Sequence, residues 1–256
     1  MRSEEKIPAP PVDPGDKFFK WLDNFWYHYK WHTIIAVFAI IVVIVGISQV
    51  VSKGTADVGV IYGGPRLLSL AEQRAVESAV RQVMEDYNQD GKLVVEFVSL
   101  MLMSDEQIQA AYDEAEKRGE EYFANAQFMR EELKKFDNLI MAGDSLLCLL
   151  DPFLYNRVLD SGGFIPLSEI FDELPESAVD EYGILLSDTE FGQYFDGVNT
   201  LPGDTILCIR TIPTFSFIKG KKRTEAYHGH HVELLRAIVA FEFPEGYVPD
   251  TTGENS

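Results

Sequence analysis

The sequence is poor in cysteine and in basic residues. It has two cysteines among 256 residues, Cys148 and Cys208, which excludes a disulfide-rich scaffold and a metal centre built on cysteine alone. Both lie inside apolar runs, which predicts buried free thiols, with a single disulfide between neighbouring strands as the alternative. Lysine and arginine number 22 against 41 acidic residues, a net charge of −19, so we expect the domain to bind neither DNA or RNA nor anionic lipid.

Charged residues are also absent between Trp31 and Ser52. The apolar run from Thr33 to Val51 leaves no polar face, so an amphipathic surface helix is excluded. A helix of about 20 apolar residues crosses the hydrocarbon core of a bilayer. We therefore predict a transmembrane helix over residues 33–51, which contacts the lipid bilayer.

An aromatic and basic segment, residues 16–32, precedes this span. Such side chains favour the membrane interface, which predicts an interfacial helix leading into the span. More lysines lie before the span than basic residues lie shortly after it, which predicts a cytoplasmic N-terminus and an extracellular C-terminal domain at the cell membrane. No small-residue cleavage site follows the apolar run, which indicates an uncleaved signal-anchor. The basic residues compared are Lys17, Lys20 and Lys30 before the span and Lys53 and Arg66 after it.

Residues 56–248 are predicted to form one α/β domain. Strands are predicted at residues 56–62, 93–100 and 138–141, and the helices between them open with capping-box spacings at Ser69 and Ser104. This alternation predicts a mostly parallel sheet covered by helices. Residues 1–15 and 249–256 are predicted to be disordered tails. Later elements are expected as a helix from Asp151, strands at 182–186 and 205–211, and a helix over 225–240.

Much of this domain resembles the extracellular solute-binding proteins of bacterial import systems, which have the periplasmic-binding-protein fold. The resemblance implies a lobe of that fold, because the domain is smaller than a complete two-lobed binding protein. The chain is also similar to single-span membrane-anchored proteins of Gram-positive bacteria with an outward α/β domain. The resemblance to binding proteins rests on Ala142-Gly143-Asp144, Leu149-Leu150-Asp151, residues 162–168, residues 182–187 and the helix from about Val232 to Phe241.

In open α/β sheets, ligands bind beyond the carboxyl ends of the strands. We therefore interpret the chain as a non-enzymatic, membrane-tethered domain that binds a small molecule or a membrane or envelope protein. Neither a cofactor nor a metal is expected. The predicted ligand-binding residues are Tyr62, Gly63, Gly64, Gly143, Asp144 and Ser145.

Two other functions stay open. Gly143-Asp144-Ser145-Leu146 resembles the first block of the GDSL lipases and esterases, which implies a cell-surface hydrolase with Ser145 as nucleophile and with Asn199 and His228 following in chain order. However, Glu225 stands where that family has an aspartate, and Ser145 could equally be a loop or helix-cap residue after a strand. The other function is a structural subunit of a membrane or envelope complex.

Two patterns could indicate a metal site. Asp86 to Gly91 matches the first half of a calcium loop, but Phe97 replaces the final glutamate, which favours a simple turn. His228, His230 and His231 could bind zinc or copper, yet no cysteine or carboxylate stands at a partner spacing. A solvated loop at the start of the last helix is therefore favoured.

Ser216 and Lys219 have the Ser-x-x-Lys spacing of penicillin-recognising enzymes. That motif requires a helix N-terminus and companion motifs, whereas this pair lies in a β-like apolar run. We therefore assign it no function.

Overall fold

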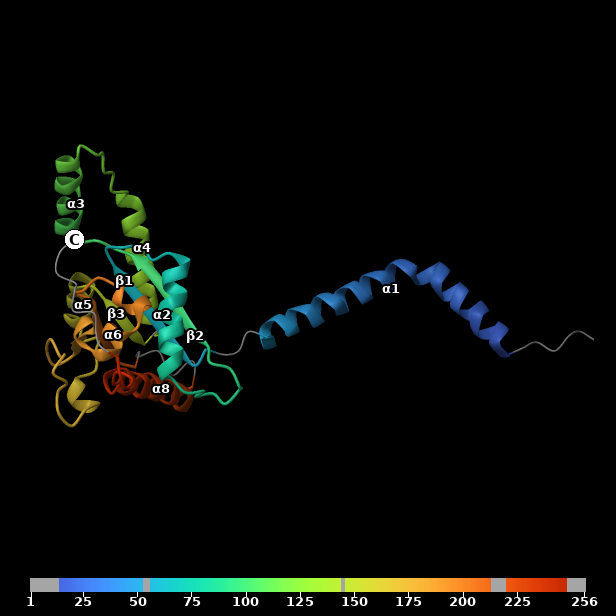
Figure 1. Cartoon of the computed structure of the whole chain (residues 1–256). Coiled ribbons are helices and arrows are strands. Elements are labelled where there is room, and N and C mark those ends of the chain that lie inside the picture. The colour runs from blue at the N-terminus through green and yellow to red at the C-terminus, as the bar shows by residue number, and fades with distance from the viewer. Residues whose placement is uncertain (1–13, 53–55, 144–145, 213–219, 248–256) are drawn as a thin grey trace, which may run out of the picture. The chain divides into compact units, whose positions relative to one another are not determined.

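The computed structural model describes residues 14–52, 56–143, 146–212 and 220–247 (Figure 1). It contains two compact units, Met1–Gly54 and Thr55–Ser256. Most of the two predicted tails lies outside the described residues, but Pro14 and Gly15 already belong to a helix. Proline suits the first turn of a helix, where its missing N–H is not needed.

The first unit contains α1 (Pro14–Ser52), one helix of 39 residues. Its segment Phe25–Ile44 is long and apolar enough to cross a membrane, with a mean hydropathy of 1.5 and no burial against the protein. The predicted interfacial helix and the predicted span are thus one continuous helix. The side chains of residues 45–51, the end of the predicted span, lie outside the described residues.

The second unit is built on a five-stranded sheet with the order β2-β1-β3-β5-β4. β1 pairs in parallel with β2 and β3, whereas β5 pairs antiparallel with β3 and β4. Only β5 therefore runs against the other strands, which confirms the predicted mostly parallel α/β sheet. The strands are β1 (Val58–Gly64), β2 (Val95–Met101), β3 (Leu147–Leu150), β4 (Gly183–Leu185) and β5 (Ile206–Ile209).

Helices cover both faces of the sheet (Figure 1). On one face pack α2 (Leu70–Val83), α8 (Lys221–Val239) and the short helices α6 (Glu190–Tyr194) and α7 (Asp196–Asn199). On the other face pack α4 (Ala126–Ala142) and α5 (Pro152–Leu159). Two short 3₁₀ helices, η1 (Leu167–Glu169) and η2 (Leu186–Asp188), complete the loops around β4.

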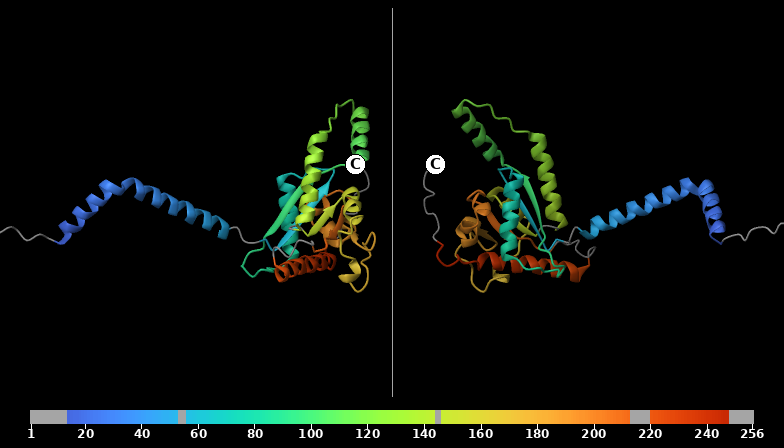
Figure 2. Two further views of the ribbon diagram at one scale, coloured as in Figure 1. Left: turned by 180° about the vertical axis from the view of Figure 1, so that it is seen from behind. Right: turned by 45° about the vertical axis from the view of Figure 1, so that its right-hand side comes forward.

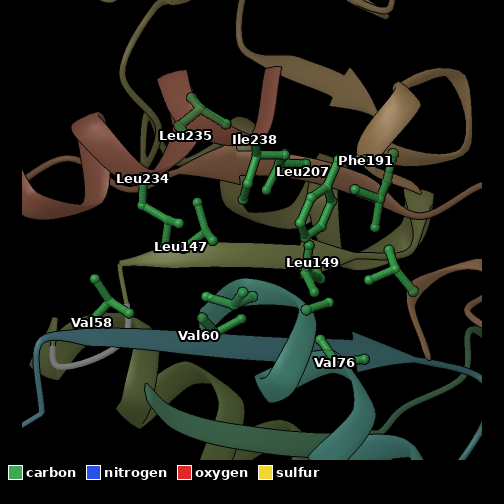
Figure 3. Packing of buried hydrophobic residues seen from close by; sticks show 14 of the residues in the cluster. Val58, Val60, Val76, Leu147, Leu149, Phe191, Leu207, Leu234, Leu235 and Ile238 are labelled. Carbon is green, nitrogen blue, oxygen red and sulfur yellow. The ribbon is translucent and has the colours of Figure 1, made fainter. Parts of the chain in front are cut away.

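Alternation along β1 divides the core into two clusters. Val58, Val60 and Tyr62 join the cluster under α2 and α8, whereas Ile61 joins the cluster under α4 and α5. Figure 3 shows the first cluster, in which leucines of α8 pack over the leucines of β3 and β5. Burial of each large aliphatic side chain stabilises the fold by about 1.5–3 kcal/mol, so both faces contribute.

The predicted helix starts are confirmed at three positions. Ser69 before α2 and Ser104 before α3 (Asp105–Arg118) each form both hydrogen bonds of a capping box. Asp151 caps α5 by accepting the Leu154 N–H at 3.0 Å. Each cap of this kind contributes about 1 kcal/mol. Gly119 ends α3 in the left-handed conformation.

The third predicted strand is wrong, because residues 138–141 belong to α4. Leu133, Phe136 and Ile140 recur at helical spacing, so the helix continues through the short apolar run until Gly143 adopts φ 65°. The true third strand is the apolar run of β3, buried on both faces. Residues 143–145 therefore precede a strand instead of following one.

α8 begins at Lys221, earlier than the predicted residue 225, so the histidines lie inside a helix and not in a loop before it. His231 is fully buried and accepts the Gly59 N–H of β1 on Nε2 at 2.8 Å. Its proton must then be on Nδ1, which donates to the Tyr227 carbonyl at 2.7 Å. A neutral imidazole thus joins α8 to the start of β1.

The other two histidines of α8 bind two more neighbours. The Nε2–H of His228 donates to the Arg210 carbonyl at 3.0 Å, just beyond β5. The His230 ring stacks on Tyr87 with the ring centroids 4.9 Å apart. The three histidines thus hold α8 against β1, the residue after β5 and the connection between α2 and β2.

We expect the domain to become less stable as the pH is lowered, because of His231. Burial lowers the pKa of its imidazole from an ordinary 6.5 to about 4, so the unfolded chain binds the proton more tightly. The stabilisation is complete above pH 6.5 and is lost as the pH falls toward 4, with about 2 kcal/mol lost between pH 7 and pH 5. Urea unfolding of the detergent-solubilised protein, followed by near-ultraviolet circular dichroism, measures it.

His231→Gln is the comparison for this measurement, because glutamine does not titrate. The variant should lack this part of the pH dependence, although other groups still titrate. If wild type and variant lose equal stability between pH 7 and pH 5, His231 is not the acid-sensitive contact.

Candidate functional site

β1 and β3 end together at one edge of the sheet, where Gly63 pairs with Leu150. The Asp151 N–H donates to the Gly63 carbonyl at 2.9 Å, which continues the pairing to the end of both strands. α2, α3 and α5 all begin at this edge, so their N-termini bring partial positive charge to it. We call this edge, formed by residues 62–69, 101–107 and 150–154, the carboxyl edge.

Tyr62 is the main unsatisfied group at the carboxyl edge. Its side chain is buried, and its hydroxyl makes no hydrogen bond of good geometry among the described residues, although the Arg66 backbone N–H lies close enough to lower its pKa. Burial raises the pKa of the hydroxyl to about 12, so the phenol is neutral at physiological pH. A buried hydroxyl without a partner costs about 1–3 kcal/mol. A ligand with a hydrogen-bonding group would supply the missing partner.

The two predicted glycines of β1 have different neighbours: Gly64 lies beside Tyr62, and Gly63 lies under α5. A Cβ at Gly64 would come within 2.8 Å of the Tyr62 hydroxyl. A Cβ at Gly63, on the opposite face, would come within 2.6 Å of Leu154 in α5. Close packing therefore explains both glycines, and their ligand-binding role stays a prediction.

Asp151 is the buried carboxylate of the carboxyl edge and is 2% exposed. One oxygen accepts the Leu154 N–H, and the other accepts the Gln107 side-chain amide of α3 at 2.9 Å. Burial raises the pKa of the carboxyl, and these hydrogen bonds oppose that shift. Asp151 thus links the first turns of α3 and α5 to the end of β3.

Arg66 brings a positive charge to the same edge, in the loop between β1 and α2. Its guanidinium forms an ion pair with Glu72 at 2.6 Å and donates to the Thr200 carbonyl. Hydrogen bonds from Ser69 lower the pKa of Glu72 to about 2, which keeps the ion-pair partner charged. The carboxyl edge therefore combines a guanidinium held by Glu72 and Thr200 with a phenol that is buried beneath the surface.

The residues predicted as the site lie at two edges of the sheet. Tyr62, Gly63 and Gly64 end β1, but Gly143 lies before the amino end of β3, which runs parallel to β1. Asp144 and Ser145 lie outside the described residues. Gly143 was expected to follow a strand because residues 138–141 were predicted as the third strand, whereas they belong to α4. The residue at the carboxyl end of β3 is Asp151, which the sequence showed only as the start of a helix.

The esterase pattern does not have its expected surroundings. In the GDSL family the serine block follows a strand, whereas Gly143 ends α4. His228 uses its Nε2 on a backbone carbonyl. Asn199 is the last residue of α7, which packs on α2. No contact among the described residues joins His228 to Asn199, and Ser145 lies outside them.

The other sequence patterns have structural explanations. In the calcium-like segment, the Asp86 carboxylate accepts the N–H groups of Asp90 and Gly91, as in a simple turn. Among the described residues no group of three or more histidine, cysteine or acidic side chains could hold a metal ion. Ser216 and Lys219 lie outside the described residues.

Cys148 and Cys208 are buried free thiols, as predicted. They face each other across the antiparallel pair of β3 and β5. Burial raises the pKa of the Cys208 thiol, so it is protonated in the folded protein.

A hollow of about 370 Å³ lies away from the carboxyl edge, between the end of α2 and α8. Its walls include Tyr87, Glu233 and Arg236. Arg236 already donates two hydrogen bonds to the Ile170 carbonyl, and Tyr87 stacks on His230. Among the described residues, buried atoms without a hydrogen-bond partner also occur beside the hollow, at His230 Nδ1, and at Arg210. We place the candidate site at the carboxyl edge because open α/β sheets bind ligands beyond the carboxyl ends of their strands.

Tyr62→Phe should leave the ligand-free protein as stable as wild type or up to about 1 kcal/mol more stable, because it removes an unpaired buried hydroxyl. Asp151→Ala should instead lower the free energy of unfolding by about 2 kcal/mol, because it removes a helix cap and leaves the Gln107 amide without its acceptor. Urea unfolding of both variants measures the contrast. A large loss in Tyr62→Phe would mean that the hydroxyl has a partner in the free protein.

The chain matches no protein-family model, no curated protein and no solved structure in the comparisons made.

Proposed function

We propose that the protein is a membrane-tethered, non-enzymatic domain that binds a small ligand or a membrane or envelope protein at its carboxyl edge. One observation carries the proposal. The hydroxyl of Tyr62 is buried without a partner at the end of β1, the position where open α/β sheets bind ligands. Few buried polar groups in proteins lack a partner, and a functional role is one of the reasons that such groups are retained.

The anchor is α1, whose segment Phe25–Ile44 can cross a bilayer. A single helix with an apolar surface offers no path for a transported solute, so it serves as a tether. The lysine bias before the span supports a cytoplasmic N-terminus and an extracellular domain. The likeness to a solute-binding lobe belongs to the same proposal.

Two charges in the apolar segment should abolish anchoring. Ile40→Asp with Ile44→Asp places two carboxylates inside the bilayer. Each raises the free energy of membrane insertion by about 2.5–3.5 kcal/mol. We expect the wild type to stay with membranes after alkaline extraction and the double variant to be released. Ile40→Leu with Ile44→Leu is the matched control and should stay bound. Release of wild type and control alike would reject the tether.

A long arm could help to bind a protein partner. α3 and the first half of α4, residues 105–132, project beyond the carboxyl edge (Figure 2). The tip carries Phe123, whose side chain is 81% exposed, beside Tyr112 and Tyr122, which pack edge to face. An exposed aromatic group beside a binding edge favours a partner that contacts both.

Ligand binding should depend on the Tyr62 hydroxyl. A thermal-shift screen of polar solutes against the full-length protein in detergent should find a compound that raises the melting temperature. Tyr62→Phe should lower the affinity for that compound about tenfold, which corresponds to the loss of one hydrogen bond of about 1.4 kcal/mol. Tyr194→Phe, in α6 and outside the carboxyl edge and the arm, is the control and should bind normally.

Equal affinity of the Tyr62→Phe and Tyr194→Phe variants would place the ligand elsewhere. A screen without any stabilising compound would favour the protein-partner form of the proposal.

A further inference from the structure

The amino edge of the sheet, opposite the carboxyl edge, is where β1, β2 and β3 begin. The chain enters the domain there, since the Asp57 N–H, just before β1, donates to the Val94 carbonyl beside β2 at 2.9 Å. The first half of α8 lies at the same edge, because His231 binds Gly59 and His228 binds the Arg210 carbonyl. The first turn of α8 continues outward from these contacts (Figure 2).

That first turn carries Lys221, Lys222 and Arg223, three consecutive basic residues with exposed side chains. We call them the basic turn. Residues 55–256 contain 36 acidic and 16 basic residues, so a run of three cations is unusual in this domain. Glu225 lies 3.8 Å from the Lys221 ammonium and offsets one charge. The turn is thus a positive patch on a strongly negative domain.

Helix stability does not explain the basic turn. The N-terminus of a helix carries partial positive charge, so cations in the first turn are unfavourable. The residue before α8 is Gly220, which makes no side-chain capping bond, whereas α2, α3 and α5 all have side-chain caps. The basic turn therefore suits an external anion better than it suits the helix.

A buried cation, Arg210, also lies at the amino edge. Arg210 is 7% exposed, and its Nε and Nη1 have no hydrogen-bond partner among the described residues. Burial lowers the pKa of the guanidinium from its ordinary value near 12.5. It still carries a proton at neutral pH, so it adds positive potential to the same edge.

The tether to α1 is short. Five residues, 53–57, join the end of α1 to the start of β1. A fully extended chain of that length spans about 20 Å at most. If α1 crosses the bilayer, the amino edge is the part of the domain that the chain keeps nearest to the lipid headgroups.

We propose that the amino edge docks on anionic lipid headgroups of the membrane that holds α1, with Lys221, Lys222 and Arg223 as the contact. This inference rests on the proposed tether. The positive patch meets a negative surface, while the remaining acidic surface is repelled from it. The contact sets the orientation of the domain and turns the carboxyl edge and its arm away from the bilayer.

Hydrogen exchange of the full-length protein in lipid nanodiscs tests the proposal. Amides of residues 220–227 should exchange about fivefold more slowly in discs with about 30 mol% phosphatidylglycerol than in phosphatidylcholine discs, the effect of about one basic residue at an anionic surface. The ratio should approach one at about 0.5 M salt, which screens the contact.

Two triple variants make the test specific. Lys221→Gln, Lys222→Gln and Arg223→Gln together should bring the ratio between the two lipids to about one. Arg130→Gln, Lys134→Gln and Lys135→Gln remove three charges from α4 and should keep the wild-type ratio. Using a ratio within each variant cancels any direct effect of the substitutions on the helix.

The possible outcomes separate the two proposals. If the protein inserts into both discs and the wild-type ratio is one, the docking surface is rejected and the tether stands. If both triple variants keep the ratio, the basic turn is not the contact. If the protein does not insert, the tether fails, and the docking proposal fails with it.

Discussion

The fold depends on one constraint, which is that β1 and β3 are apolar on both faces. Strands of this kind must be covered by helices on both sides, and parallel pairing of β1 with β2 and β3 requires a helical crossover each time. α2 and α8 cover one face, and α4 and α5 cover the other. The crossovers place every helix start after a parallel strand at the carboxyl edge. The entering chain is left at the amino edge.

The two edges therefore differ in chemistry. The carboxyl edge gathers three capped helix starts around a buried tyrosine without a partner and a buried carboxylate. The amino edge gathers the histidine contacts of α8, a buried guanidinium and the basic turn. In our account the amino edge faces the membrane and the carboxyl edge faces outward, where a ligand or partner can reach it.

Local signals in the sequence predicted much of this fold. The capping boxes at Ser69 and Ser104 and the Asp151 cap depend on residues within one helical turn, so they could be read directly. Residues 138–141 misled the prediction, because a short apolar run fits a strand or a helix and only its packing on the sheet decides. That single error moved Gly143 to the wrong edge.

Other features depend on tertiary contacts that no local pattern encodes. The hydrogen bond from Gln107 to Asp151 and the one from Gly59 to His231 join segments far apart in the chain. The lack of a partner at the Tyr62 hydroxyl likewise depends on which residues pack around it. The basic turn was visible in sequence, but its place beside the entering chain was not.

The most direct test is to label intact cells with a membrane-impermeant amine reagent and to identify the lysines that react. Lys134 and Lys135 of α4 should be labelled from outside, whereas Lys17 and Lys20 before the apolar segment should react only after permeabilisation. The reverse pattern would contradict an extracellular domain on a single membrane tether. Labelling of all four lysines in intact cells would contradict it as well.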